Sequence, residues 1–302
     1  YYSEWLMNRI RAGWVLSRNP LFSQKISCWS LEPGNVDALL FCTKDPRPML
    51  KHLDELNWMG FSVIFYITMT SYGKDLEPNI PHWRDVAEVF PELSRQIGRN
   101  RLFWRYDPLL LYGRYTVEHH LRSFREMAEV LVSFTDVCIF SFVDIYRKLS
   151  LNFPDLNPVS DQDRENLLAG LSSIASEYGL RLQSCGDSGD YMRFGISPSG
   201  CATAEILEKA LGRRFRPIHA KPARSGCRCI PSCDIGAYDT CPGGCRYCYA
   251  TRDRALSLKN YREHDPFSPL LTGRVNPGDV VIKGQQRRLT LPSVQQQFSL
   301  LD

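Results

Sequence analysis

The sequence predicts an α/β protein in which parallel strands alternate with helices to form a partial, open (β/α) barrel. Two observations predict this fold. Short apolar runs rich in β-branched and aromatic residues recur along the chain, and segments with helical spacing of apolar residues separate them. Strands that alternate with helices in this way pair in parallel through right-handed crossovers.

The strands expected in the sheet are apolar runs that end at polar residues. Residues 61–70 give the clearest one, because they are β-branched, aromatic and apolar almost throughout. Residues 25–31 are a weaker sixth candidate, so the count stays short of the eight strands of a closed barrel. The five firm strands cover residues 36–42, 61–70, 101–106, 136–142 and 180–184.

Helices are expected where apolar residues recur with a period near 3.6. The first covers residues 1–15, where Trp5, Leu6, Ile10 and Trp14 share this spacing. The helix over 116–134 starts at Thr116, a residue type that favours N-caps. The remaining helices are expected over 49–59, 82–97, 161–178 and 204–211.

The composition changes after residue 212, where Pro, Gly, Arg and Cys become frequent and regular periodicity ends. We therefore expect two units: the partial barrel over 1–212, and a Cys-rich, loop-built module with a C-terminal tail over 213–302 that packs on the barrel. Residues 271–282 read as a short hairpin within the second unit.

The charge and the hydropathy of the sequence argue against two classes of partner, nucleic acids and membranes. The formal net charge is +4, and Lys and Arg are scattered along the chain, which does not favour nucleic-acid binding. No apolar run approaches the roughly 20 residues of a membrane helix. Eight of the 11 cysteines fall between Cys185 and Cys248, which is typical of metal binding in a reducing compartment. We expect a cytoplasmic protein without a membrane partner.

Three cysteines share the segment Cys241-Pro-Gly-Gly-Cys245-Arg-Tyr-Cys248. Pro-Gly-Gly disfavours both a helix and an interior strand, so the segment is a loop on which three sulfurs can converge. Structural zinc takes four ligands, and no histidine follows at the spacing of a zinc knuckle. A 4Fe–4S cluster held by three thiolates keeps one iron open to a small molecule. The cluster is favoured, and zinc remains the alternative.

This three-cysteine motif resembles that of radical S-adenosylmethionine (SAM) enzymes. The surrounding residues, 234–250, look like the signature of the family DUF1848, which itself resembles radical SAM proteins with the motif moved toward the C-terminus. The chain departs from the family pattern in three ways. It lacks the usual first strand, it has Cys42 where the family usually has Trp, and it has Thr251 where Asn is common. Further stretches similar to the family are 2–9, 43–46, 104–108, 115–118, 141–148 and 264–271.

The resemblance implies an activity. Cys241, Cys245 and Cys248 would hold a 4Fe–4S cluster whose open iron binds SAM. One-electron reduction would cleave SAM to methionine and a 5′-deoxyadenosyl radical that abstracts hydrogen from a small polar substrate. An electron donor such as flavodoxin or ferredoxin would then be a partner. Tyr247 and Tyr249 would pack near the cluster or the adenine.

Polar residues at the strand ends are candidates to bind a polar substrate or the carboxylate of SAM, because ligands gather at the carboxyl ends of parallel strands. These candidates are Lys44, Arg105, Asp107 and Asp144. By contrast, His119 and His120 lie on an expected helix, where a surface or core role is favoured over a catalytic one.

The remaining cysteines divide into two sets. Four of them match cysteines of the family pattern, and four thiolates would close a second 4Fe–4S cluster with an electron-transfer or structural role; zinc and incidental free thiols stay open. The four are Cys185, Cys201, Cys227 and Cys229. Cys233 is interpreted as a spare, and Cys28, Cys42 and Cys138 as buried free thiols.

Two other functions remain as alternatives. The same cofactor supports cleavage of another carbon–sulfur bond of SAM, with transfer of its 3-amino-3-carboxypropyl group. A non-catalytic iron–sulfur or zinc-binding module that acts as a scaffold or sensor is the second alternative.

Overall fold

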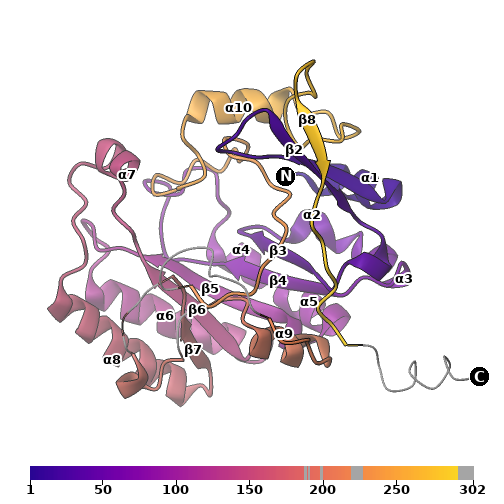
Figure 1. Cartoon of the computed structure of the whole chain (residues 1–302). Helices are drawn as coiled ribbons and strands as arrows, with labels where there is room; N and C mark the ends of the chain where they lie inside the picture. The colour runs from indigo at the N-terminus through magenta and orange to yellow at the C-terminus, as the bar shows by residue number, and fades with distance from the viewer. Residues whose placement is uncertain (187–188, 190, 198–199, 219–226, 292–302) are drawn as a thin grey trace, which may run out of the picture.

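A computed structural model describes residues 1–186, 189, 191–197, 200–218 and 227–291 (Figure 1). Its centre is a sheet of five parallel strands in the order β3-β4-β5-β6-β7, which is also their order in the chain. Within the described residues no pairing joins β3 to β7, so the sheet stays open. The predicted α/β fold with an open parallel sheet is confirmed. The strands are β3 (Leu39–Thr43), β4 (Val63–Thr68), β5 (Leu102–Leu109), β6 (Val137–Phe142) and β7 (Arg181–Ser184).

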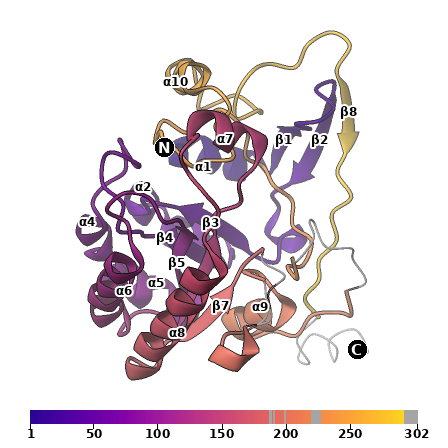
Figure 2. The same ribbon diagram turned by 90° about the vertical axis from the view of Figure 1, so that its left-hand side faces the viewer.

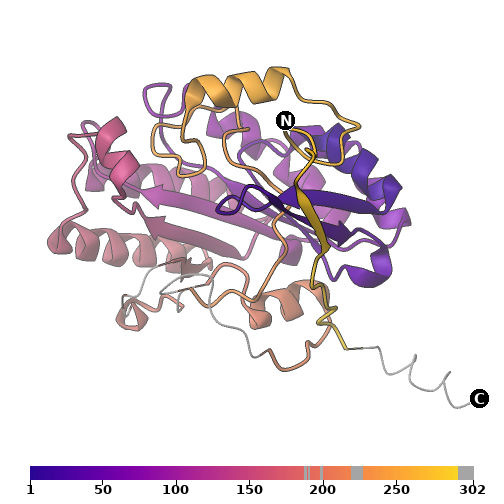
Figure 3. The same ribbon diagram turned by 45° about the horizontal axis from the view of Figure 1, so that its top comes forward.

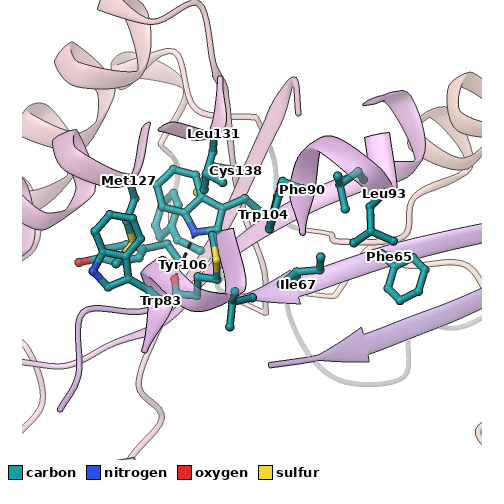
Figure 4. Packing of buried hydrophobic residues seen from close by; sticks show 14 of the residues in the cluster. Phe65, Ile67, Trp83, Phe90, Leu93, Trp104, Tyr106, Met127, Leu131 and Cys138 are labelled. Carbon is teal, nitrogen blue, oxygen red and sulfur yellow. Dashed lines mark hydrogen bonds between the residues drawn. The ribbon is translucent and has the colours of Figure 1, made fainter. Parts of the chain in front are cut away.

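Both faces of this sheet are covered. On one face, side chains such as Phe65, Trp104 and Phe140 pack in the main core beneath the helices, as Figure 4 shows for Phe65 and Trp104. Residues of the opposite pleat, including Tyr66 and Phe103, form a smaller core with the helix α9. Figure 2 shows α4, α5 and α6 on one side of the sheet and α9 on the other. Burial of both faces explains why most residues of the three central strands are apolar.

Helix boundaries follow local signals. Thr116 caps α6 as predicted, accepting a hydrogen bond from the backbone N–H of His119. Pro91 stands in the first turn of a helix, where proline is tolerated, so the predicted helix 82–97 is instead a pair of shorter helices. The predicted helix 49–59 is also a pair of shorter helices, divided at residues 51–52. The helices are α1 (Ser3–Ala12), α2 (Arg47–Leu50), α3 (Leu53–Trp58), α4 (Trp83–Ala87), α5 (Phe90–Ile97), α6 (Val117–Leu131), α7 (Arg147–Asn152), α8 (Asp161–Glu177), α9 (Ala204–Leu211) and α10 (Arg254–Arg262).

The N-terminal prediction needs correction. Helix α1 ends at Gly13, whose φ of 77° is the left-handed conformation that favours glycine, so the chain does not stay helical to residue 15. The strand β1 (Trp14–Arg18) follows and pairs antiparallel with β2 (Lys25–Ser30). The predicted strand over 25–31 therefore exists, but it belongs to a second sheet and is not a sixth strand of the parallel one.

The second sheet is completed from the far end of the chain. The strand β8 (Val280–Lys283) pairs in parallel with β2, so the hairpin predicted over 271–282 is wrong. Arg18 anchors this arrangement through two contacts of 2.8 and 2.9 Å to the Asp279 carboxylate. Figure 3 shows β8 beside the N-terminal strands, with α10 close to the N-terminus. The predicted division at residue 212 stays a prediction. No described helix has the length and apolarity to cross a membrane.

Candidate metal centre

The Cys241–Cys248 loop is fastened to the loop that follows β4. The backbone N–H of Arg246 donates to the carbonyl of Leu76 at 2.9 Å. Asn79 binds the same loop twice, through its backbone N–H to Gly243 O at 3.2 Å and through Nδ2 to Pro242 O at 2.9 Å. The three-cysteine loop is therefore joined to a loop at the carboxyl end of a central strand, which is where ligands of parallel sheets bind.

The two glycines of this loop fit its tight path. A Cβ on Gly243 would stand 2.8 Å from Ile80 Cδ1 and 3.2 Å from Cys241 Sγ. Gly244 has a φ of 70°, in the left-handed region. The backbone N–H of Gly243 also donates to Cys241 Sγ at 3.4 Å. These features bring the Cys241 sulfur close to the backbone of Gly243, while Cys241 itself is exposed.

The three thiols lie within electrostatic range of one another. Burial raises the pKa of Cys245 to about 12, with Lys44 acting in the opposite direction and Glu77, Cys248 and Cys241 adding to the rise. Burial also raises the pKa of Cys241. Raised pKa values favour the protonated thiols, so holding Cys241 and Cys245 as thiolates would require compensating positive charge nearby, of the kind that a bound metal supplies.

A buried carboxylate lies beneath the loop. Glu77 Oε1 accepts hydrogen bonds from Thr70 Oγ1 at 2.7 Å and from the Tyr247 hydroxyl, and it lies 3.0 Å from Lys44 Nζ. Lys44 Nζ is also 5.8 Å from the centre of the Tyr247 ring. Tyr247 is thus fixed against the strand ends, whereas Tyr249 is 71% exposed. Sequence reasoning missed Glu77, because an isolated acidic residue in a loop resembles any solvated one.

The four cysteines predicted for a second site also come together. Cys201 Sγ lies 3.5 Å from Cys229 Sγ, which in turn accepts hydrogen bonds from the backbone N–H groups of Cys201 and Ala202 at 3.2 and 3.3 Å. Cys185 contacts Cys201, and Cys227 contacts Cys229. The hydrogen bond from Cys201 lowers the pKa of Cys229 to about 5. We call these four residues the second thiol group.

The geometry bears on which metal fits. Among the described residues, no three His, Cys, Asp or Glu side chains converge closely enough to hold one ion. A four-iron cluster is larger and binds each thiolate through a different iron, so its ligands need not converge on one ion, and three thiols on one loop are the kind of donor that it takes. At the second thiol group, the Cys201–Cys229 separation also suits two thiolates on one tetrahedral zinc, with Zn–S bonds of about 2.3 Å. Four thiolates are the donor set that either metal takes, although no three described side chains converge on the position of one ion in this structure.

The strand-end candidates are mostly engaged by protein partners. Lys44 pairs with Glu77, and the guanidinium of Arg105 pairs with the Asp107 carboxylate, which also accepts a hydrogen bond from Ser141 Oγ. Asp144 is exposed in the loop after β6. The structure therefore brings Lys44 to the three-cysteine loop but leaves Asp144 at the surface.

The histidine and the single cysteines interpreted as structural from the sequence differ in how deeply they are buried. His120 is buried in the core, as favoured by its place on a helix, and Cys138 is fully buried. Cys28 is half-buried. Cys42 was expected to be buried, but its side chain is exposed because β3 is the edge strand of the parallel sheet.

The fold and the site define a class of protein: α/β proteins with an open parallel sheet and cysteine-rich loops at its carboxyl edge. A family described as "Domain of unknown function (DUF1848)" matches residues 1–250, and the chain belongs to this family. No curated protein matches the chain.

Two solved structures are distantly similar to the chain. A candidate α-L-fucosidase from Bacteroides thetaiotaomicron VPI-5482 is 14% identical over 56% of this chain and 52% of its own, with a TM-score of 0.29. The IOLI protein with a bound zinc atom is 11% identical over 55% of this chain and 64% of its own, with a TM-score of 0.26. The chain thus spans about half to two thirds of these two structures.

Proposed function

We propose that this protein is a radical SAM enzyme in which Cys241, Cys245 and Cys248 hold a 4Fe–4S cluster. The observation that carries the proposal is that these three thiols share one loop, which hydrogen bonds fasten to the carboxyl end of the parallel sheet. When bound, the cluster would supply the electron that cleaves SAM to a 5′-deoxyadenosyl radical, and the radical would abstract hydrogen from a small polar substrate.

The chain's own residues have positioning and charge roles in this proposal. Tyr247 ties the loop to Glu77, and Lys44 places a positive charge near Cys245. Tyr249 would cover the bound nucleoside. Asp144 and the Arg105–Asp107 ion pair lie at neighbouring strand ends, and in this proposal they would orient a polar substrate while Arg105 and Asp107 stay paired. The loops around the site would exclude water from the radical.

The second thiol group belongs to the same proposal as a closed metal site. Four thiolates occupy every iron of a 4Fe–4S cluster, or every position of a tetrahedral zinc, so this site would serve electron transfer or structure. An external donor such as flavodoxin or ferredoxin would supply electrons in the cytoplasm.

The test is SAM cleavage by the anaerobically reconstituted chain. We expect about eight iron atoms per chain if both sites hold 4Fe–4S clusters, and about four if the second holds zinc. Strong reductant and SAM should then give 5′-deoxyadenosine. Cys245→Ala should abolish this product, whereas Cys233→Ala, which removes an exposed cysteine outside both groups, should retain it.

Other products separate the alternatives. Formation of 5′-methylthioadenosine would instead indicate transfer of the aminocarboxypropyl group. Stoichiometric zinc at the Cys241–Cys248 loop with no iron and no SAM cleavage would contradict the proposal and favour a binding module.

A further inference from the structure

The side chain of Arg105 lies on the sheet face that the second thiol group covers. Successive side chains of a strand alternate between faces, so Arg105 and Phe103 point to the same side of β5. Phe103 packs in the smaller core together with Cys185 and with α9. On the neighbouring strand, the Tyr66 hydroxyl donates to the carbonyl of Cys201 at 3.0 Å, which brings the second thiol group onto this face.

The charge of Arg105 faces thiols. Cys201, Cys185 and Cys42 are its electrostatic neighbours, together with its carboxylate partner Asp107. Its side chain is only 17% exposed, and its buried Nε has no hydrogen-bond partner among the described residues. A buried charged donor without a partner is costly, so a group that carries negative charge beside it would be stabilised.

A metal-loaded second thiol group would carry that negative charge. Four thiolates bring more negative charge than one zinc ion or one oxidised 4Fe–4S core neutralises. In a partly buried site, this excess charge is stabilised by an opposite charge nearby. The observations above place one guanidinium on the same sheet face as two of the four ligands, Cys185 and Cys201, and within electrostatic range of both.

We propose that Arg105 is the counter-charge of the second thiol group, a positioning residue that stabilises bound metal there and, where the metal is an iron–sulfur cluster, favours its reduced form. Asp107 opposes this effect, because its carboxylate lies near Cys185 and carries the opposite charge. The inference rests on the proposed function only in requiring metal at the second thiol group.

The experiment uses the full chain carrying Cys245→Ala, so that the second thiol group is the only intact site. Metal is identified by elemental analysis, and a further Cys201→Ala change must release it. Release is then followed with a zinc or ferrous chelator. Arg105→Gln should release metal about ten times faster, within the 10- to 100-fold range for residues that support metal ligands. Arg105→Lys should stay near the parent rate, and Asp107→Asn should slow release.

The matched control is Arg101→Gln. It removes the same charge from the residue just before β5, where Arg101 donates to the carbonyl of Ala210 at 3.0 Å. This control should release metal at the parent rate. If the metal is iron, Arg105→Gln should also lower the ratio of reduced to oxidised cluster about tenfold at a fixed potential, equivalent to 59 mV for one electron. Asp107→Asn should raise that ratio.

Opposite shifts for Arg105→Gln and Asp107→Asn would separate a charge effect from loosened packing. A parent release rate in Arg105→Gln, or faster release in both variants, would overturn the proposal. So would a Cys201→Ala variant that loses no metal, and this result would leave SAM cleavage at Cys241–Cys248 intact. A third outcome separates the two proposals. If the rate of metal release changes with the charge at Arg105 and Asp107 but SAM is not cleaved, the counter-charge role of Arg105 is supported and the proposed function is contradicted.

Discussion

Single buried polar residues in this chain are stabilised by partners far away in sequence. Glu77 collects three donors beneath the cysteine loop, one of them Tyr247 from 170 positions further along. His120 is held on both ring nitrogens: Nε2 lies 2.9 Å from the carbonyl of Leu110, and Nδ1 lies 2.9 Å from the Tyr106 hydroxyl. Since a carbonyl can only accept, Nε2 carries the proton and neutral Nδ1 accepts from Tyr106.

Protonation of His120 should therefore destabilise the fold. Burial lowers its pKa from 6.5 to about 4, so the unfolded chain binds the proton more readily below pH 6.5. The stability associated with neutral His120 is present above pH 6.5 and is lost as the pH falls toward 4. Between pH 7 and pH 5 this should cost about 2 kcal/mol of unfolding free energy.

Urea unfolding at both pH values provides the measurement. His120→Gln should show a weaker pH dependence than the wild-type chain by that amount, whatever its absolute stability. The exposed His82, changed to Gln, should keep the wild-type dependence. An unchanged pH dependence in His120→Gln would contradict the assignment of His120 as a neutral core residue.

On the scale of elements, the sequence predicted what is local and missed what depends on distant pairing. The strands β4, β5 and β6 are rich in apolar, β-branched and aromatic residues and lie between helices, so local sequence identifies them. The four residues of β8 are all exposed, and their pairing with β2 spans more than 250 positions. Nothing in residues 280–283 indicates that partner.

The same distinction applies to the candidate site. The spacing of Cys241, Cys245 and Cys248 predicts one loop, because Pro-Gly-Gly excludes regular structure. Glu77 was missed, since only the folded chain brings it to Tyr247. The resemblance to a family, and not spacing, supplied the second thiol group: Cys185 and Cys229 lie 44 positions apart.

The path of the cysteine loop gives a prediction for this element. Gly243→Ala would place a methyl group 2.8 Å from Ile80 Cδ1 and 3.2 Å from Cys241 Sγ, so the Ile80 side chain must move and the Cys241 sulfur is displaced from its present position. We expect this variant to lose the cluster at Cys241–Cys248, lowering iron by about four atoms per chain after anaerobic reconstitution. Iron and acid-labile sulfide analysis would measure the loss.

Gly34→Ala is the matched control, because an added Cβ there meets no atom within 4 Å and the φ of Gly34 is not positive. It should bind as much iron as the wild-type chain. Equal iron contents in Gly243→Ala and Gly34→Ala would contradict the steric argument.

On the scale of the whole molecule, most cysteines lie in a segment that has no helix or strand among its described residues. The five parallel strands and their helices contain most of the buried apolar side chains. Between α9 and α10, the described residues 213–218 and 227–253 form no helix or strand, yet they carry six of the 11 cysteines. Segments with few buried apolar contacts open at low free energy unless something else holds them. Bound metal would stabilise this segment through its thiolates.

Removal of the metals should therefore loosen one part of the molecule selectively. In hydrogen–deuterium exchange of the anaerobic chain, peptides from residues 227–253 should exchange faster after chelation than in the metal-loaded protein. Peptides from β4, β5 and β6 should change little, because their hydrogen bonds and core do not depend on the cysteines. The variant Cys233→Ala should behave as the wild type does, because this exposed cysteine lies outside both thiol groups. Faster exchange throughout the described chain would show instead that the metals stabilise the sheet itself. Unchanged exchange in residues 227–253 would show that bound metal does not hold this segment.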